Sequence, residues 1–255
     1  MAFGTLLEKE EGGTIDVLGV RFHRMTSRQV IEQVLYWISE PSRRMLITAG
    51  PEFVMMTRRN AELLRITKSA DIVTPDGVGV LWAARRLGKT LHERVTGVEV
   101  TLGLLETVEK RHQTLRVYVL GATQDALDGC LKVFQDQYTT CEFRGHSGYF
   151  SPSEWPSILA EIQEFAPHLW LVGLGQPRQE MMIFEHLRML PPCVAIGVGG
   201  SIDVWSGTVK RAPNIVRKFN LEWLYRLVTQ PSRWKRQLAL PRFVWQVLKN
   251  PGNDA

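Results

Sequence analysis

The sequence predicts an α/β fold in which a mainly parallel sheet carries helices on both faces. Short apolar runs with the character of strands recur along the chain, and helical patterns separate them; the runs are residues 45–48, 71–74, 115–121, 168–175 and 193–199. Strands that alternate with helices are typical of a parallel sheet, because each crossover lays its helix against a sheet face. We therefore expect a single Rossmann-like domain, followed by a basic helical C-terminal appendage.

The residues before the first of these strands predict a hairpin and then a helix. Residues 14–25 alternate apolar and polar side chains around Gly19, a pattern typical of two short strands joined by a tight turn. Thr26 and Gln29 have the spacing of a capping box, so a helix should begin there. Later in the chain, Ser151 and Glu154 repeat this spacing and predict another helix, with Pro152 at its first position.

The positive charge of the chain is concentrated behind one boundary. After Trp205 the pattern changes to basic helices, with breaks expected at Pro213, Pro231 and Pro241. Between Lys210 and Lys249 there are ten Lys or Arg residues against one acid, while the rest of the chain is mildly acidic. We expect a catalytic α/β domain over residues 1–209 and a basic, aromatic-rich appendage over 210–255.

Length and composition limit the class of protein. With 255 residues, of which 44% are hydrophobic, the chain suits one α/β domain with an appendage. No stretch approaches the ~20 consecutive apolar residues of a membrane span. The N-terminal residues lack the basic and apolar regions of a signal peptide, so we expect a cytoplasmic protein. Three widely spaced cysteines argue against a disulfide framework and against a zinc knuckle.

Two strands end in glycine clusters that suit a phosphate ligand. The run at 168–175 ends with Gly173 and Gly175, and the run at 193–199 is followed by Gly200 after Gly197 and Gly199. Glycines at the carboxyl ends of parallel strands let backbone N–H groups approach a phosphate, which makes a nucleotide diphosphate the natural ligand. The alternative is that these glycines form ordinary tight turns between strand and helix.

Two common kinds of cofactor are not expected. Arg178 and Ile202 occupy the positions where the dinucleotide pattern G-x-G-x-x-G requires its third glycine, so NAD is disfavoured. The chain contains no Asp-x-Asp pair, which many enzymes that use sugar nucleotides need to hold a metal ion. We therefore expect neither a cofactor nor a metal ion.

Two charged residues lie where loops are expected. Asp76 follows a strand between Pro75 and Gly77, where its carboxylate could act as a general base or could cap the next helix. Arg94 could bind phosphate oxygens or could be a solvated surface charge. The spacing of the residues leaves both alternatives open.

The appendage has the composition of a docking surface. Its basic residues are interleaved with leucines and with six aromatic residues, which suits an anionic membrane surface. Nucleic acid fits this composition nearly as well.

Six segments taken together resemble the WecG/TagA/CpsF family of bacterial glycosyltransferases (glycosyltransferase family 26). They are residues 74–80, 94–99, 148–150, 171–180, 196–213 and 221–227. The resemblance implies an inverting transfer of N-acetylmannosamine or a related hexose from a UDP-sugar donor to a polyprenyl-diphosphate-linked sugar. It places the enzyme in cell-wall or exopolysaccharide synthesis, such as that of teichoic acid. It also implies peripheral attachment to an anionic membrane surface on the cytoplasmic side, without nucleic acid as a partner.

The resemblance assigns roles to individual residues. It makes Asp76 the base that deprotonates the acceptor hydroxyl, with Thr48, Arg94 and Gln179 as further active-site residues. Tyr149, beside Gly148, matches the residue that stacks on uracil, and Asp203 matches the one that hydrogen-bonds the nucleotide. The residues that bind the pyrophosphate of the lipid match Arg226, Arg233 and Arg236. The glycine clusters, namely Gly173, Gly175, Gly199 and Gly200, complete the expected UDP-sugar site.

The sequence departs from the family pattern at Gly50, where members often have asparagine. One polar contact to the donor sugar is therefore in question, and the identity of that sugar stays open. Two other readings compete: a sugar-nucleotide epimerase or dehydrogenase of the NAD type, and a nucleic-acid-binding protein that uses the basic appendage. A homo-oligomer is compatible with the sequence, which does not fix the oligomeric state.

Overall fold

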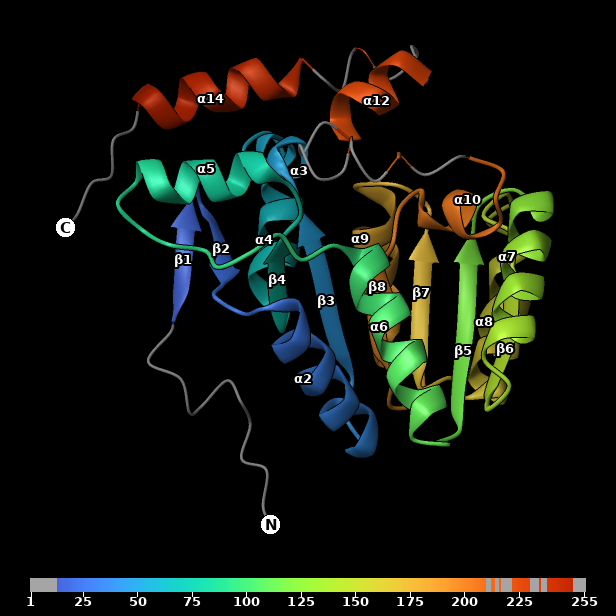
Figure 1. Cartoon of the computed structure of the whole chain (residues 1–255). Helices are drawn as coiled ribbons and strands as arrows, with labels where there is room; N and C mark the ends of the chain where they lie inside the picture. The colour runs from blue at the N-terminus through green and yellow to red at the C-terminus, as the bar shows by residue number, and fades with distance from the viewer. Residues whose placement is uncertain are drawn as a thin grey trace.

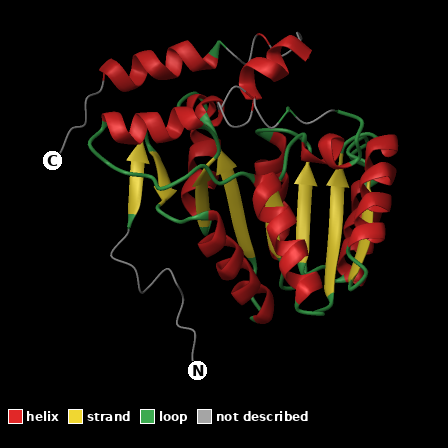
Figure 2. Ribbon diagram, viewed as in Figure 1, coloured by secondary structure: helices red, strands yellow, loops and turns green. Residues whose placement is uncertain are grey.

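The computed structural model describes residues 13–209, 212–213, 216, 222–229, 234 and 238–249. It contains a two-stranded sheet and a six-stranded sheet, with helices packed around the larger one (Figures 1 and 2). The expected α/β class with helices on both sheet faces is confirmed.

The N-terminal hairpin forms as expected. Strands β1 (Thr14–Val17) and β2 (Val20–His23) pair antiparallel. The turn is closed by the Gly19 N–H, which donates to the Asp16 carboxylate at 2.8 Å. Gly19 has φ +91°, a conformation that suits glycine. The His23 ring accepts a 3.0 Å hydrogen bond from the Val73 N–H, which attaches the hairpin to the edge of the larger sheet.

All pairings in the larger sheet are parallel. The strand order is β4-β3-β8-β7-β5-β6, with β3 Arg44–Ala49, β4 Ile72–Pro75, β5 Leu115–Gly121, β6 Cys141–His146, β7 Leu169–Gly173 and β8 Val194–Gly197. Five of these six strands coincide with the apolar runs in the sequence. The sixth, β6, was not predicted, because it lies at the edge of the sheet and its residues Glu142 and Arg144 are exposed.

Helices cover both faces of the sheet. One face carries α3 (Pro51–Thr57), α4 (Ala61–Ser69), α5 (Val78–Arg86), α8 (Trp155–Phe165), α9 (Arg178–His186) and the short η1 (Leu187–Met189). The other carries α2 (Ser27–Ser39), α6 (Gly97–Lys110), α7 (Gln124–Gln137) and α10 (Ser201–Trp205). Side chains of β3 alternate between the two cores, with Met45 and Ile47 in the first and Leu46 in the second. The capping box of Thr26 and Gln29 opens α2 as expected.

The expected helix start at Ser151 is wrong. The Ser151 N–H and hydroxyl both donate to the Glu154 carboxylate, at 2.7 and 2.6 Å, but these bonds close a turn. Helix α8 begins at Trp155, and Pro156 lies in its first turn. Proline is well tolerated there because the first N–H groups of a helix have no partner within the helix.

The C-terminal region contributes to the same core. Helix α14 (Ala239–Lys249) packs on α3 and α5 and buries Phe243 and Val247. The break expected at Pro241 is wrong. Pro241 lies in the first turn of α14, where proline is tolerated. Helix α12 (Glu222–Thr229) precedes α14, and both lie on the side toward which the strands point (Figure 1). Pro213 lies in a loop, and Pro231 falls outside the described residues. The division at residues 209 and 210 stays a prediction.

Candidate active site

The carboxyl ends of the parallel strands meet at one edge of the large sheet (Figure 1). Ligands of open α/β sheets bind at this edge, where the chain passes from strand to helix. Most of the residues singled out in the sequence lie in the loops of this edge, and they fall into three groups along it. One group surrounds the ends of β3 and β4, a second follows β7 and β8, and a third follows β6.

Asp76 is held at the tip of β4 by contacts between backbones. Its N–H donates to the Ala49 carbonyl on neighbouring β3 at 3.0 Å. A Cβ atom at Gly50 would lie 2.7 Å from the Asp76 carbonyl oxygen, so the two strand tips approach closely. Gly77 then turns the chain with φ +131° before α5 begins. The half-buried Asp76 is thus fixed at the edge of the sheet, where a general base would meet a substrate.

The segment that contains Arg94 is attached to the same strand tip. The Val95 N–H donates to the Pro75 carbonyl at 2.9 Å, and the Thr74 hydroxyl donates to the Val95 carbonyl at 3.0 Å. The Arg94 side chain is only 20% exposed and approaches the Glu99 carboxylate at 3.5 Å. Arg94 is therefore a partly buried charge and not the solvated surface charge that the sequence left open.

Thr48 lies between the Arg94 segment and the second group. It is buried near the end of β3, and a Cβ atom at Gly97 would lie 3.6 Å from its hydroxyl oxygen. The same Cβ would lie 3.5 Å from the Gly197 carbonyl oxygen, so the first residue of α6 packs against the ends of β3 and β8. Thr48, near the end of β3, and the loop residues Asp76 and Arg94 therefore belong to segments that contact one another.

Gln179 joins the ends of β7 and β8. Its side chain is 1% exposed, and its Oε1 accepts a 2.9 Å hydrogen bond from the Gly199 N–H. Gly199 has φ +51°, and its N–H is already used inside the protein. A Cβ atom at Gly197 would lie 2.5 Å from Gln179 Nε2, so the amide lies directly against bare backbone. Glycine is needed here because the amide occupies the space of a side chain.

The other glycines of the second group have different roles. A Cβ atom at Gly173 would meet Ile202 at 2.4 Å, so Gly173 allows α10 to pack on the end of β7. Gly175 has φ +76° with open space around it, so its backbone conformation is what favours glycine. Gly200 immediately precedes α10, and half-buried Asp203 lies in the first turn of that helix. Asp203 therefore lies close to the glycine turn, and its contact with a nucleotide stays a prediction.

Tyr149 is the most exposed of the expected site residues. Its side chain is 79% exposed and follows Gly148, whose N–H donates to the Ala122 carbonyl at 2.8 Å. A Cβ atom at Gly148 would crowd Leu174 at 2.7 Å and Gly121 at 3.1 Å. The loop after β6 is therefore pressed against the ends of β5 and β7, while the tyrosine ring is accessible to a ligand.

The arginines assigned to the lipid pyrophosphate are not placed. Arg226 belongs to α12, but the position of its side chain is not described, and Arg233 and Arg236 lie outside the described residues. Their role stays a prediction.

Sequence reasoning missed Glu180, which follows Gln179 on α9. The Glu180 carboxyl is 1% exposed and accepts a 2.8 Å hydrogen bond from Gln179 Nε2. Burial raises the pKa of this carboxyl to about 7, against the lowering effect of nearby amides. The sequence offers no signal for this role, because the burial of Glu180 is visible only in the structure.

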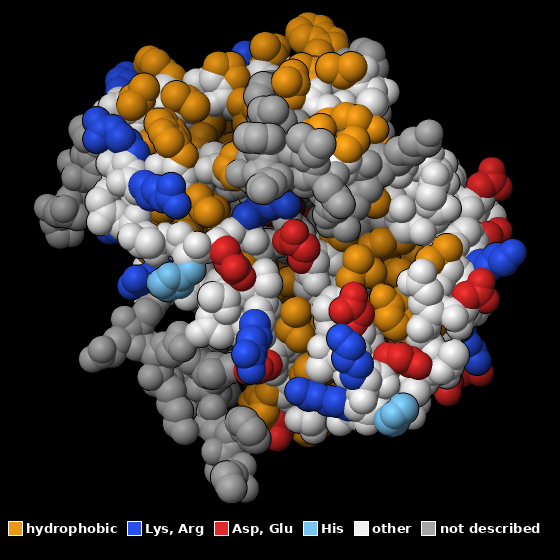
Figure 3. All heavy atoms as spheres, viewed as in Figure 1, with side chains coloured by type: hydrophobic (Ala, Val, Ile, Leu, Met, Phe, Trp, Pro, Cys, Tyr) orange, Lys and Arg blue, Asp and Glu red, His pale blue; other side chains and the backbone are white. Residues whose placement is uncertain are grey.

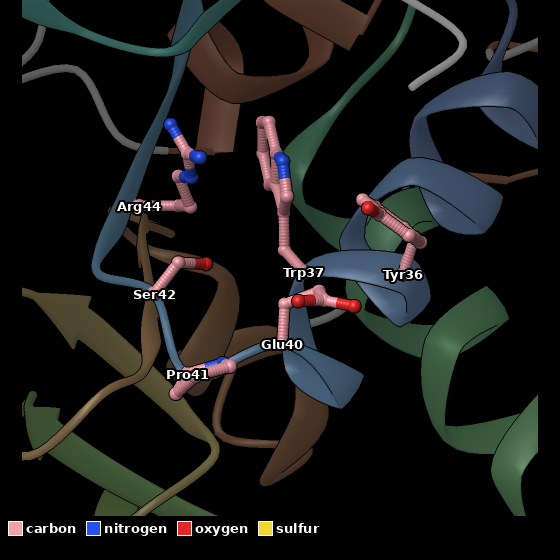
Figure 4. A pocket seen from close by; sticks show the side chains of 6 residues that line it. All are labelled: Tyr36, Trp37, Glu40, Pro41, Ser42 and Arg44. Carbon is pink, nitrogen blue, oxygen red and sulfur yellow. The ribbon is translucent and has the colours of Figure 1, made fainter. Parts of the chain in front are cut away.

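A separate cavity lies at the opposite edge of the sheet. Its volume is about 230 Å³, and its lining residues are Tyr36, Trp37, Glu40, Pro41, Ser42 and Arg44 (Figure 4). Arg44 begins β3, stacks over the Trp37 ring with its guanidinium carbon 5.4 Å from the ring centre, and pairs with Asp71 at 2.7 Å. This cavity is not part of the candidate active site, because it lies at the amino end of β3.

In the described part of the chain, no group of three or more His, Cys, Asp or Glu residues could hold a metal ion.

Comparison with known proteins identifies the family. Residues 15–254 match the family described as "Glycosyl transferase WecG/TagA/CpsF family". The chain belongs to this family. It is therefore a glycosyltransferase, and the resemblance found in the sequence is confirmed.

Two relatives are similar over most of their length. A protein of Bacillus spizizenii is 35% identical over 206 residues, which cover 80% of this chain and 79% of the relative. A protein of Staphylococcus aureus is 32% identical over 247 residues, which cover 96% of each chain. Both relatives are named N-acetylglucosaminyldiphosphoundecaprenol N-acetyl-beta-D-mannosaminyltransferase. Membership of this family argues against the two alternative functions, a sugar-nucleotide epimerase or dehydrogenase and a nucleic-acid-binding protein.

Proposed function

We propose that this glycosyltransferase moves N-acetylmannosamine from a UDP-activated donor to the N-acetylglucosamine of a polyprenyl-diphosphate lipid. The observation that carries the proposal is the similarity over 96% of both chains to a relative whose name states this acceptor and this sugar. The product would serve cell-wall polymer synthesis, as the family resemblance implies.

Asp76 is the proposed general base. In an inverting transfer, a carboxylate removes the proton of the acceptor hydroxyl while its oxygen attacks the anomeric carbon. The backbone contacts of Asp76 with Ala49 and Gly50 support this role, because a base acts well only from a fixed position. Thr48, near the end of β3, and Arg94, in the loop before α6, belong to segments that contact the end of β4. Arg94 would balance charge on the leaving diphosphate, at the expense of its pairing with Glu99.

The UDP moiety is proposed to lie over the second and third groups. Tyr149 offers an exposed ring for stacking on uracil, and Asp203 offers a carboxylate behind the glycine turn. Gln179 would hold that turn in shape, because it binds the Gly199 N–H. The diphosphate would then lie between the nucleotide and Asp76, along the ends of β7 and β8.

We also propose that α12 and α14 rest on an anionic membrane surface. Most of the large apolar side chains that are exposed in the described structure belong to these helices or lie close to them in sequence, namely Leu224, Val228, Trp234, Leu238, Val244, Trp245 and Leu248. Figure 3 shows hydrophobic side chains gathered over this end of the molecule, with Lys and Arg side chains near them. Trp245 is 56% exposed, and Lys249 lies 4.9 Å from its ring centre. Aromatic rings beside basic residues are typical of lipid headgroup contacts.

Among the described residues, no helix is long and apolar enough to cross a membrane. In this proposal, attachment depends on the exposed apolar side chains of α12 and α14 and on the basic residues near them. Each basic residue near an anionic bilayer contributes about 1 kcal/mol, so binding to vesicles should weaken as salt is raised.

A transfer assay tests the proposed function. Purified protein is mixed with a panel of UDP-sugars and a polyprenyl-diphosphate N-acetylglucosamine acceptor, and the lipid product is identified by mass spectrometry. We expect UDP-N-acetylmannosamine to be used best and activity to persist in excess EDTA, since the sequence lacks an Asp-x-Asp pair. Preference for another donor would correct the sugar, and loss on chelation that Mg²⁺ restores would contradict the expected independence of metal ions.

A further inference from the structure

Glu180 is a buried carboxyl for which the proposed reaction has no direct use. It lies in the first turn of α9 and is 1% exposed. Its Oε1 accepts a 2.8 Å hydrogen bond from Gln179, whereas its Oε2 is buried without a hydrogen-bond partner among the described residues. Burying a carboxyl in this way is unfavourable, so its presence beside the candidate active site calls for a function.

The Gln179 amide is held from both ends by Glu180 and Gly199. Nε2 donates to Glu180 Oε1, and Oε1 accepts from the Gly199 N–H at 2.9 Å. A flipped amide would place an NH₂ group against the Gly199 N–H, and two donors cannot form a hydrogen bond. The Gly199 N–H and the Glu180 carboxyl together therefore set which end of Gln179 faces the glycine turn after β8.

Glu180 is also linked to the end of β3 through Gln176. The Gln176 side chain stabilises the charged form of the Glu180 carboxyl. Its Nε2 donates at 3.1 Å to the carbonyl oxygen of Thr48. Two amides beside one carboxyl thus reach the ends of two neighbouring strands, and both ends belong to the candidate active site.

We propose that Glu180 is a positioning residue that orients the Gln179 and Gln176 amides and thereby fixes the glycine turn after β8 relative to Thr48. It does not touch the substrate. Its effect on transfer rests on the proposed function, because only then do these two strand ends hold the donor. A small displacement of such groups is costly, since a misplacement of about 1 Å can slow a reaction by about a hundredfold.

The electrostatic surroundings of Glu180 suit a carboxyl that keeps its proton. Burial raises its pKa to about 7, opposed by the Gln179 and Gln176 amides and its own backbone. The other charged or titratable residues on α9 and on the elements packed against it are Arg44, Glu62, Arg65, Lys68, Glu161, Glu164, Arg178, Glu185, His186 and Arg188. None of them forms an ion pair with Glu180 among the described residues; Arg65, for example, lies over the Phe184 ring. Above neutral pH an ionised carboxyl would therefore stay buried without a counter-charge, which favours local opening of this region.

The test uses full-length protein with Glu180→Gln and Glu180→Ala. Glutamine keeps an acceptor for Gln179 and cannot ionise, whereas alanine removes the contact. Gln33→Leu is the control, because Gln33 is a buried polar residue on the opposite sheet face without a hydrogen-bond partner among the described residues. Two readouts are measured from pH 6 to pH 8.5: hydrogen exchange of the Gly199 amide, corrected for the intrinsic effect of pH, and kcat and KM for transfer.

We expect Gly199 in the natural protein to exchange slowly at pH 6 and faster above pH 7. Glu180→Gln should exchange slowly at every pH and keep kcat within about threefold, while Glu180→Ala should exchange fast and lose about tenfold or more in kcat, with a smaller change in KM. Gln33→Leu should match the natural protein. Slow exchange and unchanged kcat in Glu180→Ala would overturn the proposal.

A second variant covers the case in which Glu180→Ala does not fold. Gly197→Ala adds a methyl group 2.5 Å from Gln179 Nε2 and displaces the same amide without changing Glu180. It should speed exchange at Gly199 and lower kcat, and unchanged values of both would contradict the proposal. If exchange behaves as expected but the natural protein transfers no sugar to the lipid, the positioning role stands and the proposed function fails.

Discussion

The strand tips around Asp76 and the helix α14 are built on opposite principles. The tips are fixed by contacts between backbones, such as Asp76 N–H to the Ala49 carbonyl and Val95 N–H to the Pro75 carbonyl. Helix α14 is attached mainly through two buried side chains, Phe243 and Val247, and leaves a large apolar surface exposed. Chemistry requires fixed atoms, whereas docking on a fluid surface requires exposed area. The contrast suggests that substitutions at the two places will separate catalysis from attachment.

The largest effect is expected at Asp76. Asp76→Asn keeps the size of the side chain but removes the proposed base, so kcat should fall by roughly 10² to 10⁴ while the affinity for UDP changes little. Steady-state transfer kinetics and calorimetry with UDP measure the two quantities. Turnover close to that of the natural protein would remove Asp76 from the mechanism.

Two aromatic residues of α14 should separate stability from docking. Phe243 is 1% exposed, so Phe243→Ala should lower the free energy of unfolding by about 3–5 kcal/mol. Trp245→Ala should leave unfolding almost unchanged but weaken binding to vesicles that contain an anionic lipid. Denaturant unfolding and vesicle sedimentation give these results. If Trp245→Ala bound vesicles like the natural protein, the exposed face of α14 would not be the docking surface.

The pH dependence of stability should reveal the buried Glu180. Its pKa in the folded protein, about 7, lies above the ordinary value of 4.5, so the folded state binds the proton more tightly than the unfolded state. The resulting stability is complete below about pH 4.5 and is lost as pH rises through about 7. The shift corresponds to about 3 kcal/mol. The stability of Glu180→Gln relative to that of the natural protein should therefore be greater at pH 8.5 than at pH 5. Stability curves that run parallel between these pH values would contradict this.

Tyr149 tests the nucleotide end of the site. Because the Tyr149 ring is exposed, its replacement by alanine should affect UDP binding far more than folding. Tyr149→Ala should weaken UDP binding by about 1–3 kcal/mol, the range for a base stacked on an aromatic ring. Calorimetry measures the affinity, and an unchanged value would move the uracil site elsewhere.

The sequence predicted what local chemistry determines. The capping box at Thr26, the hairpin turn at Gly19 and the five apolar strands follow from short-range rules, and all are present. Strand β6 was not predicted, because its own residues include exposed charges and it is a strand only through its hydrogen bonds to neighbouring β5. The break predicted at Pro241 is wrong because the sequence does not show that α14 begins at Ala239, which places Pro241 in its first turn.

The candidate site was predictable only in part. The family resemblance supplied Asp76, Thr48, Arg94 and Gln179, and the fold brings the segments that carry them to one edge of the sheet. Glu180 could not be recognised, because its importance comes from burial and from hydrogen bonds that the Gln179 and Gln176 amides complete with distant strands. A pattern of residue types does not show which side chain of a helix loses its contact with water.

The smallest effect is expected at Gly50. A substitution there tests whether the fixed strand tips matter for catalysis independently of membrane docking by α14. Gly50 has φ −94° and ψ 179°, so its backbone would accept alanine without strain. The added Cβ would nevertheless lie 2.7 Å from the Asp76 carbonyl oxygen, and this backbone atom can move only together with the strand tip. Gly50→Ala should therefore lower kcat by about tenfold through displacement of Asp76, with little effect on vesicle binding. Gly13→Ala is the matched control, since a Cβ atom there meets nothing within 4 Å. Equal kcat values for the two variants would show that the tip adjusts freely, and the close approach of β3 and β4 would then have no part in holding the base.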